Sequence, residues 1–131
     1  MAGVKATEIG VISPYKSQLQ IIRQYLSQFS RYNDVDVFTV DKYQGKDKEA
    51  IIFSLVRNNP KKKIGELLED WRRANVAFTR AKQKLIILGS MSTLQGNHFF
   101  TLFLELLQRN NWILELPQAA HKTYEFKDFK K

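Results

Sequence analysis

The 131-residue sequence contains no cysteine, so it holds neither a disulfide framework nor a metal site built on thiolates. Its two histidines, His98 and His121, lie far apart and show no ligand spacing. No apolar run approaches the roughly 20 residues that a membrane-spanning helix needs, and no apolar segment follows the first residues as in a secretory signal. The sequence therefore predicts an intracellular protein without a membrane partner.

Two motifs that hold a nucleoside triphosphate are also missing. The pattern Gly-x-x-x-x-Gly-Lys-(Ser/Thr), whose backbone N–H groups cradle phosphates, occurs nowhere in the chain. No Asp-Glu pair follows an apolar strand, where it would hold Mg²⁺. If the chain works on a nucleotide, the triphosphate and its metal must be held on another domain.

What the sequence does have is a globular composition and an excess of positive charge. Hydrophobic residues make up 44% and aromatic residues 12%, enough for one compact domain with a real core. The net charge is +8, from 21 Lys and Arg against 13 Asp and Glu. A basic domain favours polyanions such as nucleic acid or a nucleotide, although a generic basic protein has the same balance.

Apolar runs and helical spacing alternate along the chain. Apolar runs predict strands at residues 9–13, 49–56 and 84–90, and an alternating pattern predicts another at residues 35–40. Helical spacing predicts three helices, over residues 16–29, 65–82 and 100–107. Residues 92–97 are predicted as a loop and residues 112–116 as a last strand. This alternation favours an α/β fold with a right-handed, mainly parallel sheet.

The stretch Asp70-Trp71-Arg72-Arg73-Ala74-Asn75-Val76-Ala77-Phe78-Thr79-Arg80-Ala81-Lys82 separates into an apolar and a polar face when it is read as a helix. Arg73 and Arg80 are seven residues apart, so they point the same way, about two turns from each other. Two guanidinium groups on one face suit a phosphate, because the planar fork matches phosphate oxygens and stays charged. The alternative is a solvated basic helix face, which is common on protein surfaces.

Two further segments carry residue types that suit phosphate contacts. Residues 13–16, Ser-Pro-Tyr-Lys, follow the first predicted strand, where open α/β sheets bind ligands and a helix begins. Residues 39–48, Thr-Val-Asp-Lys-Tyr-Gln-Gly-Lys-Asp-Lys, place Gly45 where backbone N–H groups can approach an anion. A capping turn and a lysine-rich hairpin are the alternatives. We expect these loops and the helix after Val56 to meet along one edge of the sheet.

These three segments resemble superfamily 1B helicases, the branch that includes the nonsense-mediated-decay helicase. Residues 72–82 are similar to motif VI of that family, residues 39–48 to motif V, and residues 11–18 to its Val-Ile-(Ser/Thr)-Pro-Tyr-x-x-Gln segment. The likeness is greatest to the eukaryotic helicase/nucleases of DNA replication. It implies a three-layer RecA-like P-loop NTPase fold that lacks the phosphate loop itself. Residues 1–116 would be the second RecA-like domain, partial at its N-terminus, and residues 117–131 a charged C-terminal tail.

The resemblance also implies roles for individual residues. It makes Arg80, together with Arg73, the catalytic arginines that stabilise charge on the phosphoryl oxygens. The implied nucleotide-binding residues are Gln44, Gly45, Asp47 and Arg80. Contacts with the backbone of a nucleic-acid strand are implied for Thr39, Ser13, Pro14, Tyr15 and Lys16. Many members of the family have Glu where this chain has Asp47, whose arm is shorter.

The implied cofactor is ATP with Mg²⁺, both held mainly by the missing partner domain, so that this chain alone is inactive. The implied partners are the N-terminal RecA-like domain of the same enzyme and a single nucleic-acid strand, with DNA favoured and movement from 5′ to 3′. The implied location is the nucleus, with the mitochondrion second. Three alternatives stay open: a non-catalytic nucleic-acid-binding or regulatory module, an RNA-directed helicase of the same branch, and a small self-contained nucleotide-binding enzyme.

Overall fold

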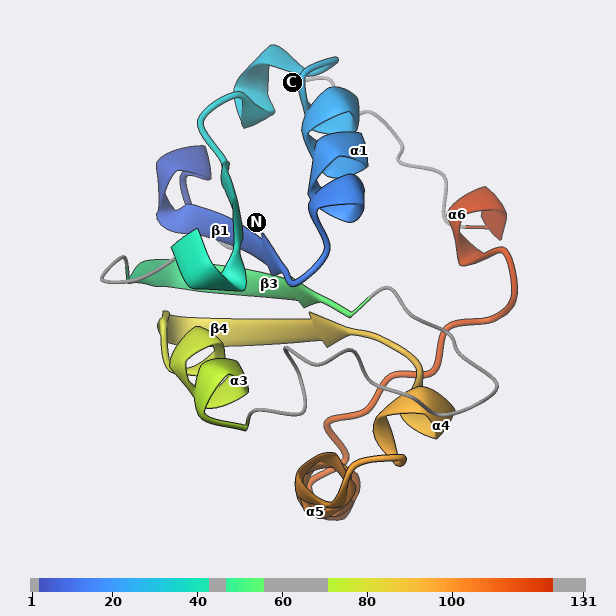
Figure 1. The fold of residues 1–131 in the computed structure, drawn as a ribbon. Coiled ribbons are helices and arrows are strands. Elements are labelled where there is room, and N and C mark those ends of the chain that lie inside the picture. The colour runs from blue at the N-terminus through green and yellow to red at the C-terminus, as the bar shows by residue number, and fades with distance from the viewer. Residues whose placement is uncertain (1–2, 43–46, 56–70, 124–131) are drawn as a thin grey trace.

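A four-stranded parallel sheet forms the centre of the fold (Figure 1). The computed structural model describes residues 3–42, 47–55 and 71–123. The strand order is β2-β1-β3-β4, and every neighbouring pair of strands is parallel. The strands are β1 (Ile9–Ser13), β2 (Asp36–Thr39), β3 (Lys48–Ser54) and β4 (Ala81–Leu88). The parallel sheet with its helices confirms the predicted α/β class.

Helices lie on both faces of this sheet (Figure 1). On one face, α1 (Lys16–Leu26) packs against β1 and β2. The other face is covered by α3 (Trp71–Phe78) and α5 (His98–Arg109). Five short segments complete the described structure: η1 (Ala6–Glu8), η2 (Ser30–Tyr32), η3 (Val40–Lys42), α4 (Met91–Leu94) and α6 (Ala120–Thr123). The arrangement is therefore three-layered, as the sequence predicted.

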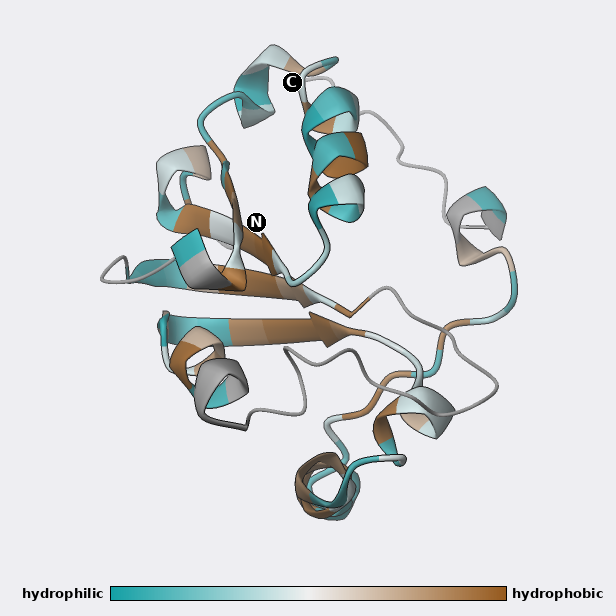
Figure 2. Cartoon of the chain, viewed as in Figure 1, coloured by the Kyte–Doolittle hydropathy of each residue, from teal (hydrophilic) through white to brown (hydrophobic). Residues whose placement is uncertain are grey.

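Alternating side chains divide the core into two clusters. Ile12 on β1 joins the larger cluster with α3 and α5, whereas its neighbour Val11 joins the smaller cluster under α1. Successive residues of a strand point to opposite faces, so a strand covered on both sides needs a continuous apolar run. Figure 2 shows such hydrophobic runs along β1, β3 and β4, and a hydrophobic α5 opposite them.

β4 departs from the prediction of a fully buried strand. Ile86 and Leu88 are 40% and 46% exposed, respectively. Ile86 pairs in register with Ile52, so both residues lie on the α1 side of the sheet. The described core cluster on that side includes Ile52 but no residue of β4. The prediction was wrong because an apolar run does not reveal that one face of an end strand is uncovered.

The structure also contradicts the predicted last strand and the predicted loop before α5. No strand in the described part of the chain pairs with residues 112–116, and Leu114 is 83% exposed. An extended segment without a partner forms no ladder, whatever its apolar alternation. Met91–Leu94 forms the short helix α4 instead of a loop, and Leu94 within it is buried in the larger core cluster. The tail predicted for residues 117–131 begins with the short helix α6.

The end of α5 explains how the chain turns at Asn111. Asn111 has a φ of 56°, in the left-handed region. Its N–H donates to the carbonyl of Gln108 at 3.1 Å, and the N–H of Trp112 donates to the carbonyl of Leu107 at 3.0 Å. These two bonds form the Schellman arrangement, in which glycine is the preferred left-handed residue because it has no Cβ.

We therefore expect Asn111→Gly to raise the free energy of unfolding of the chain by about 0.5 kcal/mol and Asn111→Val to lower it by about 1–2 kcal/mol. Urea denaturation measures both changes. Asn110, which has a φ of −94° and donates from Nδ2 to the carbonyl of Leu106 at 2.8 Å, should instead lose stability when it is replaced by glycine. A midpoint for Asn111→Gly at or below that of the wild type would contradict the assignment.

Candidate functional site

The predicted site residues lie at two opposite edges of the sheet. Ser13 and Thr39 are the last residues of β1 and β2 and pair with each other at the carboxyl edge. Asp47 and Arg80 directly precede β3 and β4, at the amino edge. The prediction that all these segments meet along one edge was wrong. β1 is parallel to both β2 and β3, so all three strands begin at the amino edge and end at the carboxyl edge.

Arg80 lies in the turn between α3 and β4. The predicted helix over residues 65–82 was too long at its C-terminal end, because Ala81 already pairs with Lys48 as the first residue of β4. The N–H of Arg80 donates to the carbonyl of Ala77 at 3.3 Å, and its carbonyl accepts from the N–H of Lys48 at 3.1 Å. Arg80 is therefore positioned by the strand ladder and does not share a helix face with Arg73. The side chain of Arg73 lies outside the described part of the structure.

Two groups of the protein hold the guanidinium of Arg80. Nε donates to the carbonyl oxygen of Val76 at 3.2 Å, and Nη1 lies 3.4 Å from Oδ1 of Asp47. The Arg80 side chain is 29% exposed and that of Asp47 53%. The strand register explains why the two residues are close. Asp47 directly precedes Lys48, Arg80 directly precedes Ala81, and Lys48 pairs with Ala81. A partly buried guanidinium thus faces solvent at the amino edge.

Lys48, the first residue of β3, connects this edge to β2 and to the segment before β1 through its side chain. Its Nζ lies 2.8 Å from Oδ2 of Asp36 and donates to the carbonyl oxygen of Thr7 at 2.6 Å. Its side chain is only 16% exposed. Sequence reasoning missed this role, since Lys48 reads as one more lysine in a basic turn. Its place directly before a predicted strand was the available signal, and its charge is already matched by Asp36.

At the carboxyl edge, the loop after β1 is shaped by Ser13. The Ser13 side chain is 0% exposed, and its Oγ accepts a hydrogen bond from the N–H of Tyr15 at 3.2 Å. Its hydroxyl therefore shapes the turn and does not reach the surface. Pro14 and Tyr15 are half-buried, and Lys16 is exposed as the first residue of α1. Thr39 is half-buried beside them.

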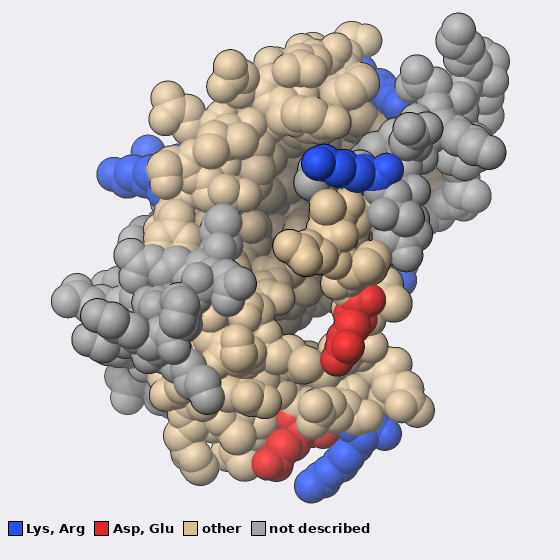
Figure 3. All heavy atoms as spheres, turned by 90° about the vertical axis from the view of Figure 1, so that its right-hand side faces the viewer, with Lys and Arg blue, Asp and Glu red and all other residues tan. Residues whose placement is uncertain are grey.

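The positive charge does not gather into one patch on this side of the molecule. Figure 3 looks onto the side toward which the β3 and β4 arrows point in Figure 1, and its Lys and Arg side chains are scattered over a mostly uncharged surface. A module that bound nucleic acid by charge alone would show a continuous basic face. On this face, the Lys and Arg side chains of the described residues form no continuous basic patch and support only local contacts.

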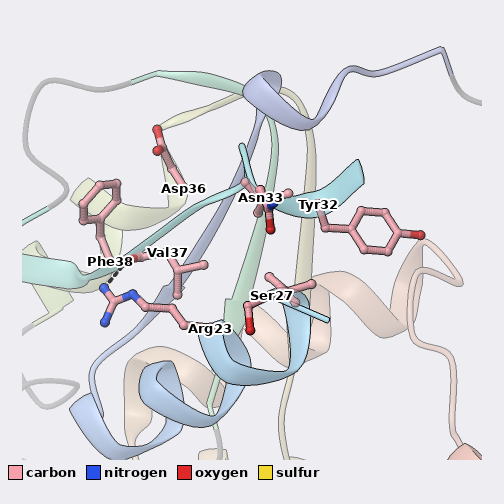
Figure 4. A pocket seen from close by; sticks show the side chains of 9 residues that line it. Arg23, Ser27, Tyr32, Asn33, Asp36, Val37 and Phe38 are labelled. Atoms are coloured by element: carbon pink, nitrogen blue, oxygen red, sulfur yellow. Dashed lines mark hydrogen bonds between the residues drawn. The ribbon is translucent and has the colours of Figure 1, made fainter. Parts of the chain in front are cut away.

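A hollow of about 330 Å³ lies between α1 and β2 (Figure 4). Arg23 of α1 projects along it and donates a hydrogen bond to the carbonyl oxygen of Val37. Neither this hollow nor a second one beside α5 is lined by any of the predicted site residues. The Asp47 and Arg80 side chains are instead partly exposed at the amino edge, which suits groups that complete a site on another body.

Some predictions fall outside what the structure describes. Gln44 and Gly45 lie outside the described residues, so their predicted nucleotide contacts stay predictions. Within residues 3–42, 47–55 and 71–123, no group of three His, Cys, Asp or Glu side chains could hold a metal ion. Across the same ranges, no helix has the length and apolar character to span a bilayer.

Comparison with known proteins supports the predicted resemblance. A family model described as "AAA domain" matches residues 1–92. The chain is 47% identical over 116 residues to the DNA replication ATP-dependent helicase/nuclease of Schizosaccharomyces pombe, which covers 88% of this chain and 8% of that protein. It is 44% identical over 122 residues to the human protein of the same name. This match covers 93% of this chain and 11% of the human protein. The chain therefore spans about a tenth of the length of the curated relatives it matches.

Proposed function

Because the chain belongs to the AAA domain family, whose model matches residues 1–92, we propose that it is a motor domain of an ATP-dependent DNA helicase. Residues 1–116 form the second RecA-like domain, and residues 117–131 form its tail. The relatives are named as DNA replication ATP-dependent helicase/nucleases, which favours DNA as the substrate and the nucleus as the location, with the mitochondrion second. The complete enzyme is the longer polypeptide of which this chain is one part.

The observation that carries this proposal is the Arg80 guanidinium at the amino edge, held by Val76 and Asp47 and still facing solvent. Such a group fits a phosphate oxygen, because it stays charged and offers donors in a plane. ATP, bound with Mg²⁺ mainly on the partner domain, supplies the phosphoryl group that is transferred to water. Arg80 enters from this chain and stabilises the negative charge that develops there, as an arginine finger does. Arg73 adds a second guanidinium from α3.

The two-edge arrangement gives the domain a way to couple hydrolysis to movement. Thr39, Pro14, Tyr15 and Lys16 lie at the carboxyl edge, where they contact the strand backbone without reading bases. The seven residues of β3 separate this edge from Arg80 by about 20 Å. Movement of Arg80 toward the nucleotide therefore shifts the strand-binding edge as part of one rigid sheet.

The proposal is tested by ATP hydrolysis of the complete enzyme, measured without nucleic acid, with single-stranded DNA, and with RNA of the same sequence. We expect DNA to stimulate hydrolysis and RNA to stimulate it less. We also expect unwinding of a duplex that carries a 5′ single-stranded tail. Equal stimulation by RNA would favour an RNA-directed helicase, and DNA binding without hydrolysis would favour a non-catalytic module.

A further inference from the structure

We propose that Asp47 is a positioning residue that acts on the nucleotide through Arg80. This role deepens the proposed function and rests on it. The resemblance implied that Asp47 is itself a nucleotide-binding residue. The geometry points instead to a carboxylate that orients the guanidinium, so that the remaining nitrogen of Arg80 meets the phosphate.

The three guanidinium nitrogens of Arg80 lie in different surroundings. Nε is bonded to the carbonyl of Val76, and Nη1 faces the Asp47 carboxylate. In the described part of the chain, Nη2 makes no hydrogen bond. Fixing two of the three nitrogens sets the plane of the guanidinium and leaves one set of donors for a ligand oxygen. The carboxylate thus selects which edge of Arg80 faces outward.

Asp47 is suited to this role because its backbone is held while its side chain is accessible. The residue after it, Lys48, pairs with Ala81 in the ladder and is anchored to Asp36 and to the Thr7 carbonyl. The 3.4 Å separation from Arg80 and the 53% exposure of Asp47 indicate an ion pair that adds little to folding stability. Its value lies in orientation, since small errors in the placement of a catalytic group slow the reaction strongly.

A double-mutant cycle in the complete enzyme separates the two roles of Asp47. Single-turnover ATP hydrolysis and KM are measured for the wild type, Asp47→Ala, Arg80→Ala and the double variant. We expect Asp47→Ala to lower kcat about 5-fold to 30-fold, the range for one orienting hydrogen bond to a charged group, with KM changed less than about twofold. In the Arg80→Ala background the same substitution should have no further effect.

The conservative variant Asp47→Asn keeps an oxygen that accepts from Nη1, so it should lose less kcat than Asp47→Ala. The matched control is Glu49→Ala, which breaks the neighbouring ion pair between Glu49 and Lys82 at 3.7 Å on the same two strands. It should leave kcat and KM unchanged. Thermal unfolding of each variant, unchanged from the wild type, shows that the loss of kcat is not a loss of folding.

Three results overturn the proposal. If Asp47→Ala costs the same factor with and without Arg80, the carboxylate acts independently, and the proposed function of Arg80 stands without it. If Asp47→Ala leaves kcat unchanged in both backgrounds, Asp47 does not position Arg80. A third result, in which Arg80→Ala itself keeps full turnover, removes the proposed function of Arg80 and the role of Asp47 with it.

Discussion

Replacing Arg80 with alanine is expected to lower ATP turnover of the complete enzyme by about 10³-fold to 10⁵-fold, the effect of losing an arginine finger. ATP binding should change little, because the triphosphate is held mainly by the partner domain. The physical reason is that Arg80 stabilises charge that appears on the phosphoryl oxygens only as the reaction proceeds. Turnover at saturating ATP and the dissociation constant for ATP are measured on the same preparation.

Arg80→Lys is expected to be nearly as inactive as Arg80→Ala. An ammonium group keeps the charge but has a single nitrogen, so it cannot bond to Val76, face Asp47 and reach a phosphate together. The matched control is Arg109→Ala, which removes an exposed arginine in the last turn of α5. This control should keep wild-type turnover. A loss of DNA affinity in Arg80→Ala, with turnover intact, would point to a nucleic-acid-binding module instead.

Phe53→Ala is expected to lower the free energy of unfolding by about 3–5 kcal/mol, a large share of the roughly 5–15 kcal/mol of a typical domain. Phe53 is 0% exposed and lies on β3 between Ile12 of β1 and Ile87 of β4. Its ring meets that of Phe78 edge-to-face, with the centroids 5.2 Å apart. Removing the ring leaves a cavity under the last residue of α3, just before Arg80.

Urea denaturation of the chain, or of the complete enzyme where the domain unfolds separately, measures this loss. Leu102→Ala is the matched control, because Leu102 is an apolar residue of α5 that is 54% exposed. It should change the free energy of unfolding by less than about 0.5 kcal/mol. If both variants lost the same stability, the larger core cluster would not be centred on Phe53.

Much of the fold could be predicted from sequence because its signals are local. Apolar runs predict β1 and β3, an alternating pattern predicts β2, and the spacing of Phe100, Leu104 and Leu107 predicts α5. The ends of elements are less predictable, since they depend on partners elsewhere in the chain. Pairing with Lys48 draws Ala81 into β4 and ends α3 at Phe78, although the helical stripe continues in the sequence.

The sequence suggested candidate residues but not their arrangement. The family resemblance implied roles for Asp47 and Arg80, and in the structure Oδ1 of Asp47 lies 3.4 Å from Nη1 of Arg80. The spacing of the motifs does not show at which edge of the sheet a connection ends. Thr39 and Asp47 were therefore expected at the same edge. Burial is likewise invisible in a short motif, which is why Ser13 was predicted as a contact residue although its side chain is fully enclosed.

The affinity of the complete enzyme for ADP with aluminium fluoride, a mimic of the phosphoryl group in transfer, tests the proposed role of Arg80 most directly. We expect Arg80→Ala to weaken binding of this mimic by about 100-fold or more, while the affinity for ADP alone stays within about threefold. Equal affinity of the wild type and Arg80→Ala for the mimic would contradict this expectation, because no guanidinium from this domain would then meet the transferred group.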